Sequence, residues 1–160
     1  MSGGRGSVGV VFESMFDIDA DASEAQLREV VERCEALKSK AAAAQARATA
    51  LWAAKRAAAE AASGIPARRR GKGLASEVAL ARRDAPACGN THLGMARALV
   101  DEMPHTLAAL EAGQLSEYRA LLIVRESACL SVQDRRALDA ELAERACQVF
   151  CVGGRFTGRG

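Results

Sequence analysis

The amino-acid sequence predicts an all-α protein, and three observations lead to this fold class. The 160 residues are 49% hydrophobic but only 4% aromatic, so alanine, leucine and valine supply most of the apolar surface. Alanine and leucine are strong helix formers, whereas strands favour aromatic and β-branched residues. No segment alternates cleanly between apolar and polar residues, as a half-buried strand would. We therefore predict one long alanine-rich heptad helix followed by a bundle of about five shorter helices.

The length predicts a single helical domain over residues 23–151. The glycine-rich ends, residues 1–22 and 152–160, are expected to be a flexible N-terminus and a flexible tail. We see no secretory signal and no apolar run long enough to cross a membrane. The five cysteines are an odd number, which favours reduced thiols. Together these features predict a cytoplasmic protein without a membrane partner.

The first helix is predicted over residues 24–62. Ser23 and Gln26 match the capping box that begins a helix, and Gly64 and Pro66 follow its end. Sixteen of the 39 residues are alanine. Apolar residues recur at alternating spacings of four and three, which is typical of a coiled coil. This heptad seam comprises Val30, Cys34, Leu37, Ala41, Ala44, Ala48, Leu51, Lys55, Ala58 and Ala62, with Lys55 as its one break. We expect the helix to pack on later helices, on a second copy of the chain or on a domain outside this chain.

A basic breaker over residues 64–73 (GIPARRRGKG) separates this helix from the predicted bundle, residues 74–151. The next helix is predicted from Leu74 to about Arg83, with Leu74, Val78 and Ala81 on its buried face. Asn90 or Thr91 is predicted to cap a third helix that runs to about Met103.

Local signals also predict the last three helices. Pro104 can open the fourth helix, and Gly113 is expected to close it. Ser116 is the predicted N-cap of the fifth helix. Ser131 and Asp134 repeat the capping signature before the sixth.

Charge is strongly segregated along the chain, although the net charge is only +2. Residues 36–73 carry nine basic side chains against Glu60 alone, a net charge of +8. Such a segment can attract the phosphates of nucleic acid or an acidic protein surface, and a solvated helix face with a basic linker is an equally good interpretation. The candidate nucleic-acid-binding residues are Arg68, Arg69, Arg70, Lys72, Arg82, Arg83, Asn90, Thr91, His92 and Arg97.

The helices predicted at 74–83 and 91–103 resemble the helix-turn-helix unit, which lays its second helix in a DNA groove. Asn90, Thr91 and His92 would then lie at the start of the reading helix, where they could contact bases or phosphates. The intervening turn is long and contains Pro86 and Gly89. The same pattern fits any helical hairpin in a bundle, and this alternative is slightly favoured by the spacing.

The sequence offers little support for catalysis. It lacks the nucleophile-elbow, phosphate-loop and zinc-protease motifs. Cys88 and His92 could meet only if one helix contained both, and Cys147 and Cys151 match core thiols better than half of a zinc site. We therefore predict no metal, no cofactor and no catalytic residue, and we do not expect this chain to be an enzyme.

Residues 73–144 resemble the mycobacterial 13E12-repeat family, which belongs to the actinobacterial group called domain of unknown function 222. The most telling segments are residues 96–117 (ARALVDEMPHTLAALEAGQLSE) and 119–130 (RALLIVRESACL). The resemblance implies a helical domain that, in fuller members, precedes a C-terminal HNH endonuclease domain, with genes linked to mobile elements. No histidine follows His105, so no HNH residue can be assigned in this chain. The last residues do not resemble the family, which suggests a truncated copy.

Three functional hypotheses follow. The first is a non-catalytic helical accessory domain that binds DNA through the helix-turn-helix-like unit and the basic breaker. The second is a structural module that self-associates through the heptad seam. The third is a truncated relic without retained function.

Overall fold

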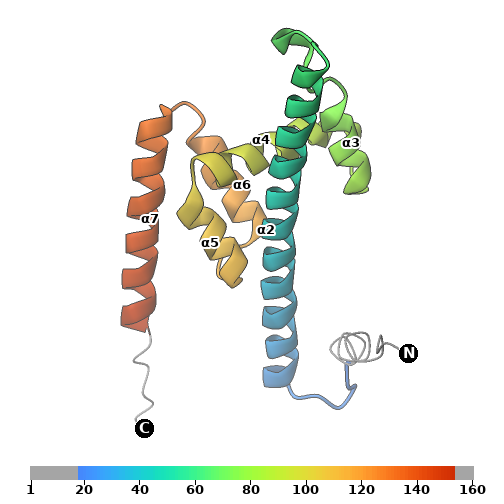
Figure 1. The fold of residues 1–160 in the computed structure, drawn as a ribbon. Helices are drawn as coiled ribbons and strands as arrows, with labels where there is room; N and C mark the ends of the chain where they lie inside the picture. Colours follow the sequence, from blue (N-terminus) through green and yellow to red (C-terminus); the bar gives the residue numbers. More distant parts are fainter. Residues whose placement is uncertain (1–17, 154–160) are drawn as a thin grey trace, which may run out of the picture. The chain divides into compact units, whose positions relative to one another are not determined.

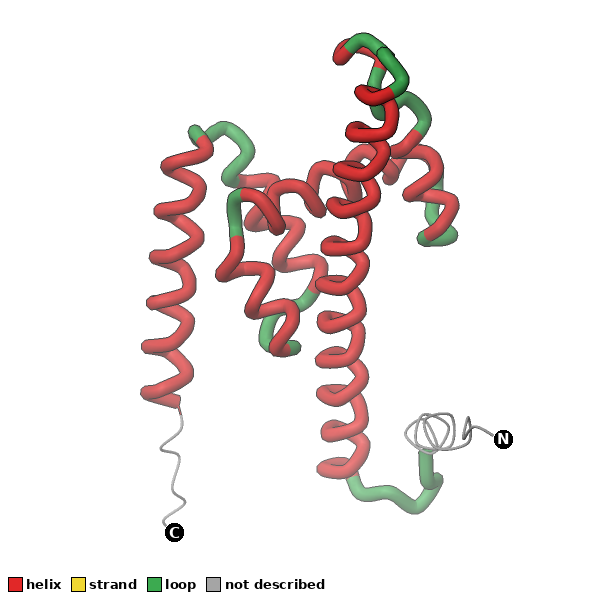
Figure 2. Tube along the Cα trace, in the orientation of Figure 1, coloured by secondary structure: helices red, strands yellow, loops and turns green. Residues whose placement is uncertain are grey.

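The computed structural model describes the backbone of residues 18–153 and the side chains of residues 18–144. These residues form six α-helices and two short 3-10 helices, with no strand among them (Figure 1), and the helices are joined by short loops (Figure 2). The predicted all-α fold class is confirmed. The chain divides into two compact units, Met1–Cys34 and Glu35–Gly160, and each is described by itself. The predictions for residues 1–17 and 154–160 lie outside the described residues.

Helix α2 spans Glu24–Ala62, the range that the sequence predicts. At its start, in the first unit, the Ser23 backbone N–H donates to Gln26 Oε1 at 2.8 Å, and the Gln26 N–H faces Ser23 Oγ at 3.4 Å. This is the reciprocal capping box. At its end, in the second unit, Gly64 takes a left-handed φ of 74°, and the N–H of Ile65 bonds to the carbonyl of Glu60 at 2.9 Å. That geometry closes the helix as a Schellman motif.

The buried face of α2 differs from the predicted heptad seam. In the second unit its buried residues are Ser39, Ala42, Ala43, Ala46, Thr49 and Ala53. The seam residues from Ala41 to Ala62, including Leu51 and Lys55, are all exposed. At 100° per residue these two sets lie on opposite sides of the helix. The helix does pack on later helices, one of the three expected alternatives, but it does so through the face opposite the predicted seam.

Two further helices, α3 (Leu74–Ala81) and α4 (Gly89–Asp101), depart slightly from the predicted ones. The buried residues of α3 are Leu74, Val78 and Ala79, whereas Ala81 is exposed. Helix α4 begins at Gly89 because a short 3-10 helix, Pro86–Cys88, leads directly into it. The predicted caps Asn90 and Thr91 therefore already lie inside the helix, and neither caps it.

Helix α5 (Pro104–Ala112) begins and ends at its predicted signals, and helix α6 (Glu117–Glu126) begins at its predicted N-cap. Pro104 is the first residue of α5, and Gly113 ends that helix with a φ of 77°. The Ser116 hydroxyl accepts a hydrogen bond from the backbone N–H of Arg119 at 3.4 Å, which caps α6. Local sequence signals were sufficient here because each one acts on the backbone of its own helix end.

Two groups of buried residues make up the core, and α4 contributes to both. In Figure 1, α4 crosses α2, with α3 on one side of α2 and α5 and α6 on the other. The larger group comprises Ala43, Ala46, Met95, Ala96, Ala98, Leu99, Met103, Leu110, Ala120 and Val124. The smaller group comprises Ala53, Leu74, Val78 and Leu93, with Trp52 packed against it.

Helix α7 (Val132–Gly153) is attached to the bundle through polar side chains. The carboxylate of Asp139 is fully buried and accepts hydrogen bonds from the backbone N–H groups of His105 at 2.8 Å and Thr106 at 2.9 Å. It also accepts a bond from the Thr106 hydroxyl. Asp139 therefore caps the N-terminus of α5 from another helix, where negative charge is favourable. The predicted Ser131–Asp134 cap of α7 is confirmed, with the Asp134 N–H donating to Ser131 Oγ at 3.1 Å.

Two arginines extend this attachment. Arg135 donates to the carbonyl of Ser127 at the end of α6 and pairs with the carboxylate of Glu102. Arg136 donates to the carbonyl of Asp101 at the end of α4, at 2.9 Å. The first turns of α7 thus satisfy backbone groups at the ends of three other helices. Among the described helices, none is long and apolar enough to span a lipid bilayer.

We predict that Asp139→Ala lowers the free energy of unfolding by about 2–3 kcal/mol, because three donors lose their acceptor and the two Thr106 donors are buried. Urea unfolding followed by circular dichroism measures this change. The control is Asp134→Ala, which removes an exposed capping carboxylate from the same helix and is expected to cost less than about 1 kcal/mol. Equal effects of the two substitutions would contradict the capping role of Asp139.

Candidate nucleic-acid interface

The basic breaker folds into a defined loop between α2 and α3, which we call the basic tip (residues 63–73). A carboxylate oxygen of Glu60 accepts the backbone N–H of Gly71 at 2.6 Å, and Arg70 Nε donates to the carbonyl of Ile65 at 2.8 Å. These two bonds close the loop from both sides. Glu60 was not among the predicted site residues, although it is the only acid in the +8 segment, and that isolation was a usable signal.

An ion pair braces the base of the tip. Arg56 on α2 binds Glu77 on α3 with two hydrogen bonds, at 3.1 and 2.7 Å. The hydrogen-bonded guanidinium lowers the pKa of Glu77, and the carboxylate raises the pKa of Arg56. The pair joins the last turns of α2 to the first turn of α3, so it fixes where the tip is displayed.

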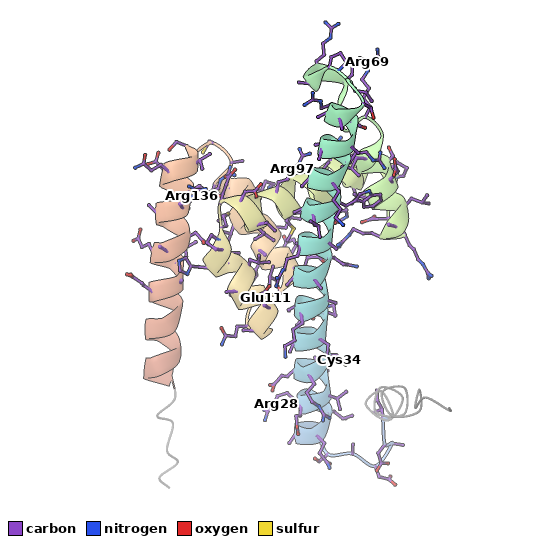
Figure 3. The ribbon with its side chains drawn as sticks, in the orientation of Figure 1. Arg28, Cys34, Arg69, Arg97, Glu111 and Arg136 are labelled. Atoms are coloured by element: carbon purple, nitrogen blue, oxygen red, sulfur yellow. The ribbon has the colours of Figure 1, made fainter. Side chains whose placement is uncertain are left out.

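The tip presents cations to solvent. Arg68, Arg69 and Lys72 are exposed, and none of their side chains has a hydrogen bond or ion pair to another described residue. Arg70 is exposed as well, although its Nε is used within the loop. Figure 3 labels Arg69 at the end of the tip, where its side chain points away from the helices. Four predicted basic residues are therefore gathered on one small, ordered loop.

Helices α3 and α4 pack closely, but their connection differs from a helix-turn-helix. Seven residues, 82–88, separate them, whereas the DNA-binding motif uses a turn of three or four residues. The close packing depends on Gly89, because a Cβ there would lie 2.0 Å from the carbonyl oxygen of Ala75. The pair is thus a tightly packed helical hairpin, which agrees with the structural alternative left open by the sequence.

Only part of the predicted reading helix faces solvent. Asn90 and Thr91 are exposed on the first turn of α4. The side chain of His92 is only 16% exposed, and its Nε2 donates to a carboxylate oxygen of Asp84 at 2.8 Å. His92 therefore fastens α4 to the preceding loop. It does not extend toward a DNA groove.

Arg82 is also turned inward. Its side chain is 18% exposed, and its guanidinium binds Glu117 on α6 at 2.6 Å and the amide oxygen of Gln45 on α2. Its Nε is buried without a partner. A charge neutralised by Glu117 inside the bundle is a poor phosphate ligand, so Arg82 is less suited to this role than the exposed cations of the tip. The sequence alone could not pair it with a residue 35 positions away.

The remaining two candidates lie apart from the tip. Arg83 follows the C-terminal end of α3, whereas the tip precedes the N-terminal end of the same helix. Arg97 is exposed in the middle of α4, where this helix crosses α2 (Figure 3). The predicted basic residues thus fall into separate places, and only the tip brings several of them together.

The described residues contain no arrangement typical of catalysis. Burial and the charge of Asp84 raise the pKa of the Cys88 thiol, the opposite of what a nucleophilic cysteine requires. No three His, Cys, Asp or Glu side chains within the described range lie close enough together to hold a metal ion. The pair Cys147 and Cys151 lies outside the residues whose side chains are described.

In comparisons with known proteins, no family model, curated protein or solved structure matches this chain.

The backbone of Arg83 generates a stability prediction. Arg83 occupies the left-handed position of a Schellman motif, with a φ of 57°, where α2 and α5 use Gly64 and Gly113. A left-handed conformation strains any residue with a Cβ. We expect Arg83→Gly to raise the free energy of unfolding by about 0.5–1 kcal/mol in urea titrations. The control Arg119→Gly, at a helical position, should instead destabilise by up to about 1 kcal/mol.

Asp84 generates a pH prediction. Hydrogen bonds from His92 and from the Ala85 backbone lower the pKa of Asp84. A carboxyl group whose pKa is lower in the folded state stabilises that state at pH values above its ordinary pKa. This stabilisation is lost as the pH falls below about 4. Asp84→Asn should therefore be less stable than the parent at pH 7, and the difference should shrink at pH 3. A difference independent of pH in urea unfolding would contradict this assignment.

Proposed function

We propose that this chain is a non-catalytic helical accessory domain that binds the phosphate backbone of double-stranded nucleic acid through the basic tip. The observation that carries the proposal is the tip itself. Arg68, Arg69 and Lys72 are exposed, and their side chains have no hydrogen-bond or ion-pair partner among the described residues. The loop that displays them is ordered by Glu60. Clustered lysine and arginine side chains displace counterions from nucleic acid, which drives binding without reading sequence.

Backbone binding is favoured over base reading because His92, one of the three residues assigned to the start of the reading helix, is fastened to the preceding loop by Asp84. Asn90 and Thr91, the other two, are exposed and remain candidates for contacts. A duplex is favoured over a single strand because the tip contains no aromatic side chain on which a base could stack.

The family context belongs to the same proposal. The segment that resembles the 13E12-repeat family, residues 73–144, corresponds to α3–α6 and the first half of α7. In fuller members such a domain precedes an HNH nuclease domain, so a tip that holds duplex DNA would serve a nuclease carried elsewhere. What supports this is the sequence resemblance together with the all-α fold of the segment.

The test is fluorescence anisotropy of the full chain with a labelled 20-base-pair duplex at 50 and 200 mM NaCl. If the tip neutralises about three phosphates, affinity should fall about 40-fold between these salt concentrations. Replacing Arg68, Arg69 and Lys72 together by alanine should strongly reduce the affinity for the duplex at 50 mM NaCl. It should also remove most of the dependence of that affinity on salt.

The matched control removes the same charge elsewhere, by changing Lys40, Arg119 and Arg125 to alanine. These residues are exposed on α2 and α6. This control should bind the duplex nearly as well as the parent. Equal losses in both triple variants would show that net charge, and not the tip, governs the affinity, and the proposal would then be wrong.

A further inference from the structure

A groove of about 580 Å³ runs between α2 and α4, away from the basic tip. Its floor on α2 consists mainly of small apolar residues such as Ala48 and Ala54, together with Leu51. Val100 of α4 lines the other side. Leu51 is 58% exposed and Val100 is 39% exposed, so the groove presents apolar surface directly to solvent. Neither the core nor the proposed nucleic-acid contact uses these residues.

The charges around the groove are mainly basic. Arg47 and Arg97 both line it, and the Arg97 side chain has no hydrogen bond or ion pair to another described residue. Arg47 pairs at 2.6 Å with Glu111, and both side chains remain well exposed. Lys40 and Lys55 are exposed on the same stretch of α2. Asp101 is the one acid that lines the groove.

We propose that this groove binds an amphipathic helix of a partner protein, with small apolar residues on one face and acidic residues on its flanks. A floor of alanines allows a second backbone to approach closely, as in helix-in-groove recognition. The basic rim selects acidic flanks. A second copy of α2 is a poor occupant, because Lys40, Arg47 and Lys55 of each copy would meet like charges. The inference is independent of the tip, which lies beyond the end of α2.

The probe is a labelled 21-residue synthetic helix with alanine and leucine at heptad spacing and glutamate at the flanking positions. The control peptide has lysine in place of every glutamate. Anisotropy titration of the full chain should show that the glutamate peptide binds at least tenfold more tightly than the lysine peptide. Arg97→Glu should narrow or reverse this preference. An equal affinity for both peptides would overturn the proposal.

Leu51→Lys should weaken binding of the glutamate peptide at least tenfold. Leu80→Lys is the matched control, because Leu80 is 78% exposed on α3 and does not line the groove. It should leave the affinity unchanged. The emission of Trp52, which packs against the smaller core group, verifies that each variant is folded. Unchanged binding by folded Leu51→Lys would overturn the groove assignment.

Two further measurements separate this proposal from the other interpretations. Light scattering should give the mass of a monomer. If it gives a dimer instead, and Leu51→Lys dissociates that dimer, a second copy of the chain occupies the groove and the proposed partner is wrong. The tip variant lacking Arg68, Arg69 and Lys72 should bind the peptide normally. Its loss of peptide binding would place the peptide on the tip and also overturn the proposal.

Discussion

The packing of the second unit depends on the small size of the α2 contact face. Ala42, Ala43 and Ala46 are nearly or fully buried, and their methyl side chains occupy little of the core volume. The volume of the core must therefore come from the opposing helices. Leu99, Met103 and Leu110 supply it and are fully buried. Because the bulk is supplied from one side, α4 and the residues that follow it determine how the bundle is packed.

Close backbone contact is the second consequence of this small-residue packing. Gly89 lies against the carbonyl of Ala75, and Gly113 lies against Ala36, where a Cβ would be only 3.0 Å from the Ala36 methyl group. At such contacts, dispersion between backbones replaces the interlocking of large side chains. Helix α7 uses a different principle, because Asp139 and Arg135 attach it by satisfying helix ends. Its position is thus fixed by directional hydrogen bonds, and none of the α7 residues whose side chains are described, 132–144, belongs to either core group.

Some polar side chains maintain this packing and others face solvent. The exposed ones mark the candidate functional surfaces. Arg82 pairs with Glu117 inside the bundle, and His92 is hydrogen-bonded to Asp84 of the preceding loop. Arg69 and Arg97 remain exposed at two separate places, one on an ordered basic loop and one beside an apolar groove. The first place has the chemistry of a phosphate contact and the second has that of a helix-binding surface.

The sequence by itself determined the all-α fold and the helix boundaries that carry a local signal, including both ends of α2 and of α5. Signals such as Ser23, Pro104 and Gly113 act on backbone groups within a few residues, so they can be read without the fold. Tertiary structure decided which face of α2 is buried. With alanine at sixteen of 39 positions, apolar residues lie on every side of that helix, and periodicity cannot distinguish the packed face from the exposed one. The inward turn of Arg82 and the cap supplied by Asp139 were likewise decided only in the fold, because their partners lie more than 30 residues away and no local pattern records such pairs.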